Sequence, residues 1–255
     1  EVLDEIIQPR GIYERNDVPV REVEGIPQVK GFLKGDFDPL IEIEENGIRI
    51  IVDVENGQKT GYFLDQRENR MALKGIVDGA EVLDAFCYTG SFALHALKYG
   101  AADVTAIDIS SSSLELARKN AEINGFSEKI DFMEGNVFDI LRDFQKSGRT
   151  FDVVILDPPA FTKSQKMVRN ALRGYKEINL RAIKIIRDGG FLVTCSCSQH
   201  ITSELFQGMI EDASFDSDRI LRLVEFRNQA KDHPILLPHP ESLYLKCGIY
   251  QVLKK

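Results

Sequence analysis

The fold is decided by residues 83 to 92, which read Leu83-Asp84-Ala85-Phe86-Cys87-Tyr88-Thr89-Gly90-Ser91-Phe92. An apolar run ends in an acid, a short turn follows, and a helical pattern begins after Gly90. This order of strand, turn and helix lets the backbone approach a ligand and points the free N–H groups of the helix start at it, which suits a nucleotide-like cofactor. The dinucleotide pattern GxGxxG is missing because only Gly90 is present, so a Rossmann dehydrogenase is poorly supported.

The chain on both sides of this stretch, from about residue 66, alternates apolar runs with helical periodicity, as parallel sheets with crossover helices do. The sequence predicts a doubly wound, mostly parallel α/β fold with ligands bound at the carboxyl ends of its strands. Strands are expected at residues 81–85, 103–108, 129–133, 151–156 and 190–194, and helices at 92–98, 112–124, 137–145, 167–186 and 202–213. Residues 242–253 should form a closing strand that pairs antiparallel at the sheet edge.

The N-terminal part has a different character. Residues 41–44 and 48–54 alternate apolar and polar side chains, and Glu45-Asn46-Gly47 between them is a tight-turn signal, so a β-hairpin is expected. We expect residues 1–60 to form a linker and hairpin region and residues 61–255 to form the main domain. Because the chain starts at Glu1 rather than Met, and residues 2–7 resemble the end of an amphipathic helix, we also expect a further module upstream.

Composition narrows the class of protein. With 43% hydrophobic and 28% charged residues, the chain resembles an ordinary globular protein. It contains no apolar run of the roughly 18 residues that span a bilayer and no leader pattern, so a cytoplasmic protein without a membrane partner is expected. Its four cysteines lack zinc-ligand spacing, so no metal is expected. A formal charge of -8 speaks against a nucleic-acid partner unless basic residues cluster locally.

Two later strand ends extend the predicted cofactor site, to which the first turn contributes Asp84, Phe86, Tyr88 and Gly90. Asp108 ends the next strand, with Ile109 directly after it, a little over 20 residues after Asp84, where an acid can accept both ribose hydroxyl hydrogens. The alternative is that Asp108 only caps the following helix. Asn136 with Val137 stands where an amide could read the adenine ring, although a plain helix cap is equally consistent.

The chemistry is expected at the next two strand ends. Asp157-Pro158-Pro159-Ala160-Phe161 presents a carboxylate and an aromatic ring on a backbone stiffened by two prolines, and a flat base could stack on Phe161. Thr194-Cys195-Ser196-Cys197-Ser198 should bring a thiol into the same cleft beside Asp157. Cysteines at strand ends are otherwise often small buried apolar residues.

A thiol at this place suits methylation of a pyrimidine carbon. Carbon 5 of cytosine is a weak nucleophile, but thiolate addition at carbon 6 makes an enamine that can attack a sulfonium methyl group. The carboxylate of Asp157 could stabilise charge developing on the ring.

Basic residues gather directly after the proposed base-binding loop. Residues 163–187 contain eight basic residues and one acid, Glu177. This local excess of positive charge partly offsets the argument that a net charge of -8 disfavours a nucleic-acid partner. Part of this basic run is equally consistent with the solvated face of a helix. Lys163, Lys166 and Arg173, however, are placed to meet phosphates.

Several motifs in this order resemble the bacterial 23S rRNA large subunit methyltransferase I family of 5-methylcytosine enzymes. They are Thr60-Gly61-Tyr62-Phe63-Leu64-Asp65-Gln66-Arg67, the turn from Asp84 to Phe92, Asp157-Pro158-Pro159-Ala160-Phe161, Arg173-Gly174-Tyr175-Lys176-Glu177-Ile178-Asn179, Ser196-Cys197-Ser198, Asp232-His233-Pro234 and Leu243-Tyr244-Leu245-Lys246. The resemblance covers nearly the whole chain. It implies the seven-stranded sheet of the class I methyltransferases that depend on S-adenosylmethionine (SAM), with ribosomal RNA as partner and an N-terminal PUA RNA-binding domain that is absent here.

The resemblance also assigns residues. Cys197 would be the nucleophile, because the family's Ser-Cys-Ser aligns with Ser196-Cys197-Ser198, and Cys195 would be an extra thiol. Asp108 would hold the ribose. The segment covering the cofactor would contain Phe63, Asp65, Gln66 and Arg67. Other RNA 5-methylcytosine enzymes carry a second cysteine in the loop after the fourth strand, where this chain has Pro158-Pro159-Ala160. Product release would therefore need another base, either Asp157 or a water molecule.

Other functions remain open from the sequence. An Asp-Pro-Pro-aromatic loop also serves rRNA guanine or adenine N-methyltransferases, which need no thiol. A SAM-binding RNA module without catalysis and a small-molecule methyltransferase are further alternatives. The exposed hairpin edge could pair with a second copy, which would make a homodimer.

Overall fold

The computed structural model describes residues 1–162 and 164–255, and its contacts divide the chain into the units Glu1–Leu64 and Asp65–Lys255. The first unit contains two antiparallel strand pairs, β1 with β2 and β3 with β4. Its elements are α1 (Val2–Ile7), β1 (Ile12–Asn16), α2 (Val20–Val23), β2 (Val29–Lys34), β3 (Leu40–Glu45) and β4 (Ile48–Asp53).

The expected hairpin is β3–β4. Asn46 and Gly47 between the strands have φ values of 53° and 75°, and two successive left-handed residues make the turn whose twist matches antiparallel strands. The helix expected near the N-terminus is α1. The β1–β2 pair was not expected, because its strands are joined by a long connection that contains α2 and carries no tight-turn signal.

The second unit is built on a seven-stranded sheet in the order β10-β11-β9-β8-β5-β6-β7. The neighbours from β9 through β7 pair in parallel, and β11 pairs antiparallel with both β9 and β10, so the predicted fold class is confirmed. The strands are β5 (Glu81–Ala85), β6 (Asp103–Asp108), β7 (Ile130–Glu134), β8 (Phe151–Leu156), β9 (Ile186–Ser196), β10 (Arg219–Arg227) and β11 (Lys246–Lys254).

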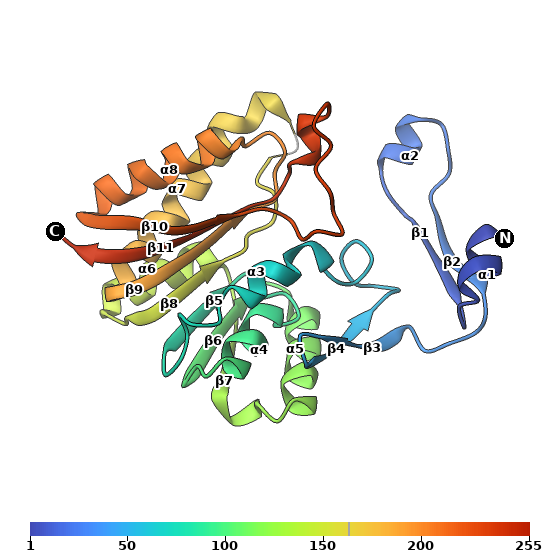
Figure 1. Ribbon diagram of the computed structural model, residues 1–255, viewed down its shortest axis with the longest axis horizontal. Coiled ribbons are helices and arrows are strands. Elements are labelled where there is room, and N and C mark those ends of the chain that lie inside the picture. Colours follow the sequence, from blue (N-terminus) through green and yellow to red (C-terminus); the bar gives the residue numbers. More distant parts are fainter. Residues whose placement is uncertain (163) are drawn as a thin grey trace. The chain divides into compact units, whose positions relative to one another are not determined.

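Helices cover both faces of this sheet (Figure 1). α3 (Arg67–Met71), α4 (Ser91–Lys98) and α5 (Ser111–Ile123) lie on one face, and α6 (Val137–Ser147), α7 (Val168–Ile185) and α8 (Ser203–Ser217) lie on the other. Short 3-10 turns are η1 (Leu64–Gln66), η2 (Ser127–Lys129), η3 (Gln165–Met167) and η4 (Pro240–Ser242).

The strands feed two apolar cores, one on each face of the sheet. Val153 and Ile155 on β8 enter the core under α4, whereas Val154 between them enters the core under α7. This alternation follows from the period of two along a strand, and it holds the sheet between two helix layers. Loops at the carboxyl ends of the parallel strands therefore share one edge.

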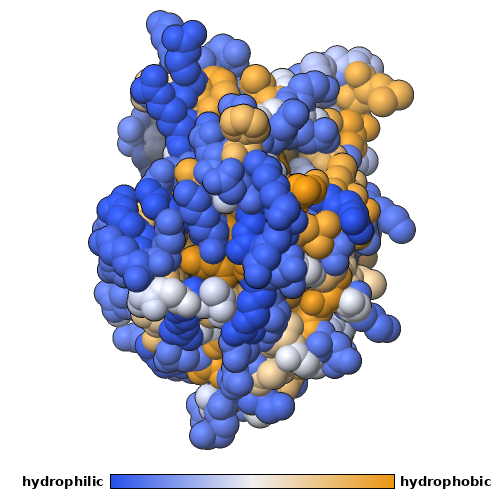
Figure 2. Space-filling model, turned by 90° about the vertical axis from the view of Figure 1, so that its left-hand side faces the viewer, coloured by the Kyte–Doolittle hydropathy of each residue, from blue (hydrophilic) through white to orange (hydrophobic). Residues whose placement is uncertain are grey.

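Figure 2 shows the opposite end of the sheet, where the parallel strands begin. Hydrophilic side chains predominate on this surface, and apolar side chains form smaller groups among them.

Two details of the sheet differ from expectation. The final strand is antiparallel but does not lie at the edge, because β10 forms hydrogen bonds with its outer side. The sequence had not indicated β10. Strand β9 begins at Ile186 rather than near residue 190, because Gly189, with φ of 83°, and Gly190 allow an irregular start that the sequence reads as a turn.

Candidate active site

The turn between β5 and α4 has an unusual backbone. Phe86, Tyr88 and Gly90 all have positive φ values, of 68°, 49° and 83°. Residues other than glycine rarely adopt this conformation, and they keep it only where surrounding contacts impose it. The backbone N–H of Cys87 donates to the carbonyl of Ile107 (2.9 Å), and the N–H of Tyr88 donates to the carboxylate of Asp108 (2.9 Å). The first two strand ends are therefore tied together.

Asp84 lies beneath this turn and is completely buried. One carboxylate oxygen accepts the N–H of Ala93 (2.9 Å), but the other, Oδ1, has no hydrogen-bond partner. Burial, together with the charges of Asp157 and Asp108, raises the pKa of Asp84 to about 8 in spite of that hydrogen bond. A buried acid with an unused oxygen would be stabilised in its ionised form by a positively charged ligand group.

Asp108 and Ile109 lie at the end of β6. Besides holding Tyr88, Asp108 accepts the N–H of Ser110 (2.9 Å) through its second oxygen. The cap of α5 is Ser110, whose hydroxyl accepts the N–H of Ser113 (3.2 Å), so Asp108 itself is not the helix cap. Ile109 beside it is 70% exposed, an apolar surface next to the predicted ribose position.

Asn136 and Val137 follow β7. The side-chain oxygen of Asn136 accepts the N–H of Phe138 (2.9 Å) and caps α6, which is the second of the two roles expected for it. Its amide NH2 group is a separate donor. Val137 is buried in the core, with 3% of its surface exposed.

The structure separates the two neighbouring cysteines. Cys195 lies on β9 opposite Cys247 of β11 and is fully buried, and its interaction with Cys247 together with burial raises its thiol pKa well above the usual value. Cys197 lies just beyond the end of β9 and is half-buried. Its Sγ is 3.9 Å from the carbonyl oxygen of Pro158. The β8 and β9 loops therefore meet at this thiol, as the sequence predicts.

The Asp65–Arg67 segment reaches the same loops. The amide of Gln66 donates to the carboxylate of Asp157 (2.9 Å), and the hydroxyl of Tyr244 donates to Asp65 (2.8 Å). Arg67 instead forms an ion pair with Asp232 (2.9 Å). Asp65 and Gln66 are nearly fully buried, so this segment is a fixed part of the site. Phe63 belongs to the first unit, where the ammonium of Lys59 lies 4.9 Å from its ring centroid.

Phe161 is held among other aromatic rings. Its centroid lies 4.5 Å from that of Tyr175 and 5.9 Å from that of Phe138. A Cβ atom at Gly174 would come within 3.2 Å of the ring, so glycine there permits the close approach to α7. Much of Phe161 is thus used for packing, and base stacking on it stays a prediction.

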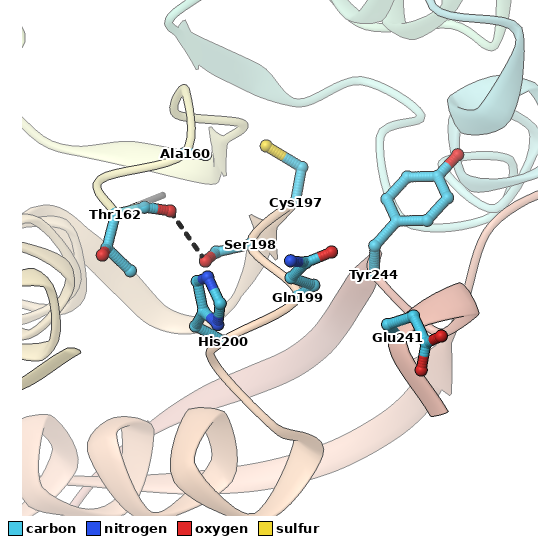
Figure 3. A pocket seen from close by; sticks show the side chains of 8 residues that line it. All are labelled: Ala160, Thr162, Cys197, Ser198, Gln199, His200, Glu241 and Tyr244. Atoms are coloured by element: carbon cyan, nitrogen blue, oxygen red, sulfur yellow. Dashed lines mark hydrogen bonds between the residues drawn. The ribbon is translucent and has the colours of Figure 1, made fainter. Parts of the chain in front are cut away.

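A pocket of about 310 Å³ opens beside Cys197. Its lining residues come from three loops of the second unit and are Ala160, Thr162, Cys197, Ser198, Gln199, His200, Glu241 and Tyr244. In Figure 3 the side chains of Cys197 and Tyr244 lie on opposite sides of the open space, and the hydroxyl of Ser198 donates to the carbonyl of Thr162 (3.1 Å). Of the lining residues, only Cys197 was among the predicted site residues.

Six of the basic residues after the β8 loop fall into two groups of three. Lys176 pairs with Asp216 (2.8 Å), Arg181 pairs with Glu177 (3.0 Å), and Arg187 pairs with Asp152 (2.7 Å) and with Glu81. Lys166, Arg169 and Arg173 are exposed, and no acidic group in the described part of the chain pairs with them. Their spacing of three and four residues places them along one side of η3 and α7. Lys163 lies outside the described residues.

Comparison with known proteins identifies the family. A family model for S-adenosylmethionine-dependent methyltransferases matches residues 28–239. This chain belongs to that family. Ribosomal RNA large subunit methyltransferase I of Shewanella amazonensis is 46% identical over 98% of this chain and 64% of its own length, and the protein of the same name from Escherichia coli O139:H28 is 44% identical over 92% and 60%. The chain thus spans less than two thirds of these relatives.

A solved structure agrees with the family assignment. The methyltransferase SMU.776, complexed with SAH, superimposes with a TM-score of 0.79 at 25% identity, over 91% of this chain and 63% of its own. S-adenosylmethionine is accordingly the cofactor. The β5 end fits this cofactor, because SAM is cationic and the buried Oδ1 of Asp84, which has no hydrogen-bond partner, is an acceptor suited to a positive group.

The described residues show neither a metal site nor a membrane-spanning helix. Among residues 1–162 and 164–255, no three His, Cys, Asp or Glu side chains are grouped to hold a metal ion. No helix in the same part of the chain combines the length and apolar character needed to cross a bilayer.

Proposed function

We propose that this chain transfers a methyl group from SAM to carbon 5 of a cytosine in large-subunit ribosomal RNA, with Cys197 as a covalent nucleophile. The observation that carries this proposal is the half-buried Cys197 thiol, which lies beside the Asp157–Pro158 loop and lines a pocket of about 310 Å³. The name shared by relatives that are 44% and 46% identical supports ribosomal RNA as the substrate.

The proposed reaction begins with the thiolate of Cys197 forming a bond to carbon 6 of the ring. The electron pair of the carbon 5–carbon 6 double bond then becomes available at carbon 5, which takes the methyl group. When bound, SAM supplies this methyl group on a positively charged sulfur and leaves as the neutral thioether. A base next removes the carbon 5 proton, the double bond re-forms, and the thiolate of Cys197 is expelled.

Asp157 serves the ring in this scheme. Its carboxylate is held by the amide of Gln66 (2.9 Å), which fixes its orientation. From the loop that also contacts Cys197, it can form a hydrogen bond with the base and stabilise charge developing on it. The proton at carbon 5 would leave to Asp157 or to a water molecule.

The RNA backbone would follow the exposed basic side of η3 and α7. Lys166, Arg169 and Arg173 carry positive charge there, directly after the β8 loop, and Lys163 extends the same run in sequence. Contacts of this kind position a nucleic acid without reading its sequence.

The test is to incubate the chain, and separately its Cys197→Ala and Cys195→Ala variants, with methyl-labelled SAM and ribosomal RNA from cells lacking the modification. Digestion of the RNA then identifies the labelled nucleoside. Label in 5-methylcytidine that is lost with Cys197→Ala and kept with Cys195→Ala supports the proposal. If the label appears in guanosine or adenosine and Cys197→Ala leaves it unchanged, N-methylation of a purine replaces the proposed reaction. Binding of SAM without any label would favour a non-catalytic RNA module.

A further inference from the structure

The chain buries a lysine directly behind the proposed nucleophile. Lys246 is the first residue of β11, and only 1% of its surface is exposed. Its ammonium donates to the carbonyl oxygens of Ser198 (2.6 Å) and Tyr244 (2.9 Å), both of which are uncharged. No carboxylate among the described residues forms an ion pair with it.

Such a charge is costly to bury. An ammonium group loses its hydration on burial, and two carbonyl oxygens replace it only in part. Burial accordingly lowers the pKa of Lys246 to about 8, and the negative charge of the Cys197 thiolate acts in the opposite direction. A buried cation without a carboxylate partner is more common at functional sites than in ordinary cores.

Lys246 contacts both sequence neighbours of Cys197. Lys246 pairs with Ser196 across the β9–β11 ladder, so its backbone lies opposite the residue before Cys197. Its side chain holds the carbonyl of Ser198, the residue after Cys197. Backbone pairing and the ammonium therefore fix the two neighbours of the thiol.

Apart from His200, the other ionisable groups near the thiol do not supply this positive charge. Those with an interaction with Cys197 or a place in its pocket are Asp157, Tyr175, His200, Glu241 and Tyr244, and Asp65 lies behind Tyr244. The carboxylates oppose a thiolate. Burial raises the pKa of Tyr175 to about 12 and raises that of Tyr244, so both tyrosines stay neutral. His200, at the pocket wall, is the remaining group that can carry positive charge.

We propose that Lys246 is a positioning residue that holds the Cys197 loop through Ser198 and stabilises the thiolate form of Cys197 with its ammonium charge. This inference rests on the proposed function, in which Cys197 is the nucleophile. The thiol proton passes to water when the thiolate forms, and Lys246 keeps its own proton. When the sulfur bonds to the base its negative charge disappears, and the ammonium is ready to receive the thiolate again at product release.

The test measures thiol reactivity and does not depend on methyl transfer. The rate at which iodoacetamide modifies Cys197 is followed from pH 5 to 10 by peptide mass spectrometry, in the wild type, Lys246→Met and Lys254→Met. Lys254 lies on the same strand but is exposed, so its variant is a matched control. We expect the wild-type midpoint to lie below the usual thiol value of about 8.5. Lys246→Met should raise it by at least about one pH unit, with roughly tenfold slower modification at pH 7, and Lys254→Met should not change it.

Overlapping profiles for wild type and a folded Lys246→Met variant would overturn the inference. If that variant does not fold, the wild-type profile still decides, because a midpoint near the usual thiol value would itself overturn it. Methyl transfer is assayed separately on the same samples. A shifted profile without methyl transfer would retain the role of Lys246 and reject the proposed function. Methyl transfer through Cys197 with an unshifted profile would support the proposed function and reject the role of Lys246.

Discussion

At the scale of single residues, two cysteines only two positions apart have different surroundings. Spacing alone would place Cys195 and Cys197 on one face of an extended strand, but β9 ends at Ser196, so only Cys195 lies in the ladder, opposite Cys247. The sequence favoured Cys197 through a family motif alone. The structure supplies the physical reason, which is that a fully buried thiol resists ionisation and cannot reach a substrate.

This contrast predicts the number of reactive thiols. The chain has four cysteines, of which Cys87, Cys195 and Cys247 are buried. A thiol reagent such as Ellman's should therefore modify one thiol rapidly in the native protein and all four after denaturation. In Cys197→Ala the rapid phase should disappear, whereas Cys195→Ala should keep it. A rapid phase that survives in Cys197→Ala would show that another cysteine is accessible.

Asp84 predicts a pH dependence for cofactor binding. Its pKa is raised to about 8 by burial, so the apo protein holds a proton there at neutral pH. A cationic cofactor favours the ionised form, so binding should release this proton, and affinity should fall by up to about tenfold per pH unit below pH 8. Calorimetry in two buffers with different ionisation enthalpies measures the released proton.

Asp84→Asn is the matched variant for this measurement. The amide oxygen can still accept the N–H of Ala93 but cannot ionise, so both the buffer dependence and the pH dependence should vanish. Identical heats of binding in the two buffers for the wild type would contradict the assignment of Asp84 to the cofactor.

At the scale of elements, the sequence predicted the buried strands well and the exposed ones poorly. Strands β5, β6 and β8 begin and end where the apolar runs do, because strands covered on both faces are nearly continuous in apolar residues. Strand β10 carries Arg219, Arg222 and Glu225 and is largely exposed, so its pattern resembles a polar loop. Because β10 was not predicted, β11 was wrongly predicted to lie at the edge of the sheet.

The places of the candidate site residues could be predicted where they lie at the carboxyl end of a strand. Asp84 and Asp108 are among the last residues of β5 and β6, and Asp157 and Cys197 directly follow β8 and β9, so sheet topology brings all four to one edge. The pocket residues Glu241 and Tyr244 come from a loop before β11 that meets the β9 loop only through antiparallel pairing in the folded sheet. For Lys246 the sequence signals were its place at the start of an apolar strand and its membership of the motif Leu243-Tyr244-Leu245-Lys246.

The exposed basic side of α7 predicts a local effect on RNA binding. Changing Lys166, Arg169 and Arg173 to Gln should weaken RNA affinity by about 10- to 100-fold and lower the slope of log affinity against log salt by roughly 2, because phosphate contacts release counterions. Fluorescence anisotropy with a labelled ribosomal RNA fragment across a salt series measures both quantities.

A second triple variant separates local charge from total charge. Lys74, Lys119 and Lys129 are also exposed and form no ion pair with a described residue, and changing them to Gln removes the same amount of charge from other parts of the second unit. This variant should bind RNA nearly as the wild type does. Equal losses in the two triples would mean that overall charge, rather than the α7 side, governs binding.

At the scale of the whole molecule, a formal charge of -8 and an RNA substrate are compatible only if charge is distributed unevenly. The structure contributes to this by pairing Lys176, Arg181 and Arg187 with acids. Lys166, Arg169 and Arg173 stay exposed. We expect the overall acidity to weaken binding to other nucleic acids, whereas these three exposed residues lie in the segment after the proposed base-binding loop.

The two buried charges of the site also predict how global stability depends on pH in the absence of cofactor. Between pH 4 and 8 the folded state holds a proton on Asp84 that the unfolded chain releases, so ionisation of this group makes stability fall as pH rises. Between pH 8 and 10.5 the unfolded chain holds a proton that the buried Lys246 has lost, so this group makes stability rise. Each slope is at most about 1.4 kcal/mol per pH unit.

Urea unfolding at steps of pH from 5 to 10 tests both slopes by comparing variants with the wild type. The unfolding free energy of Asp84→Asn, minus that of the wild type, should increase up to pH 8 and then level off. The same difference for Lys246→Met should be level up to pH 8 and decrease above it. Because other titrating groups are shared, they cancel in each difference, and a difference that stays constant across its window would mean that the corresponding charge is not buried in the folded protein.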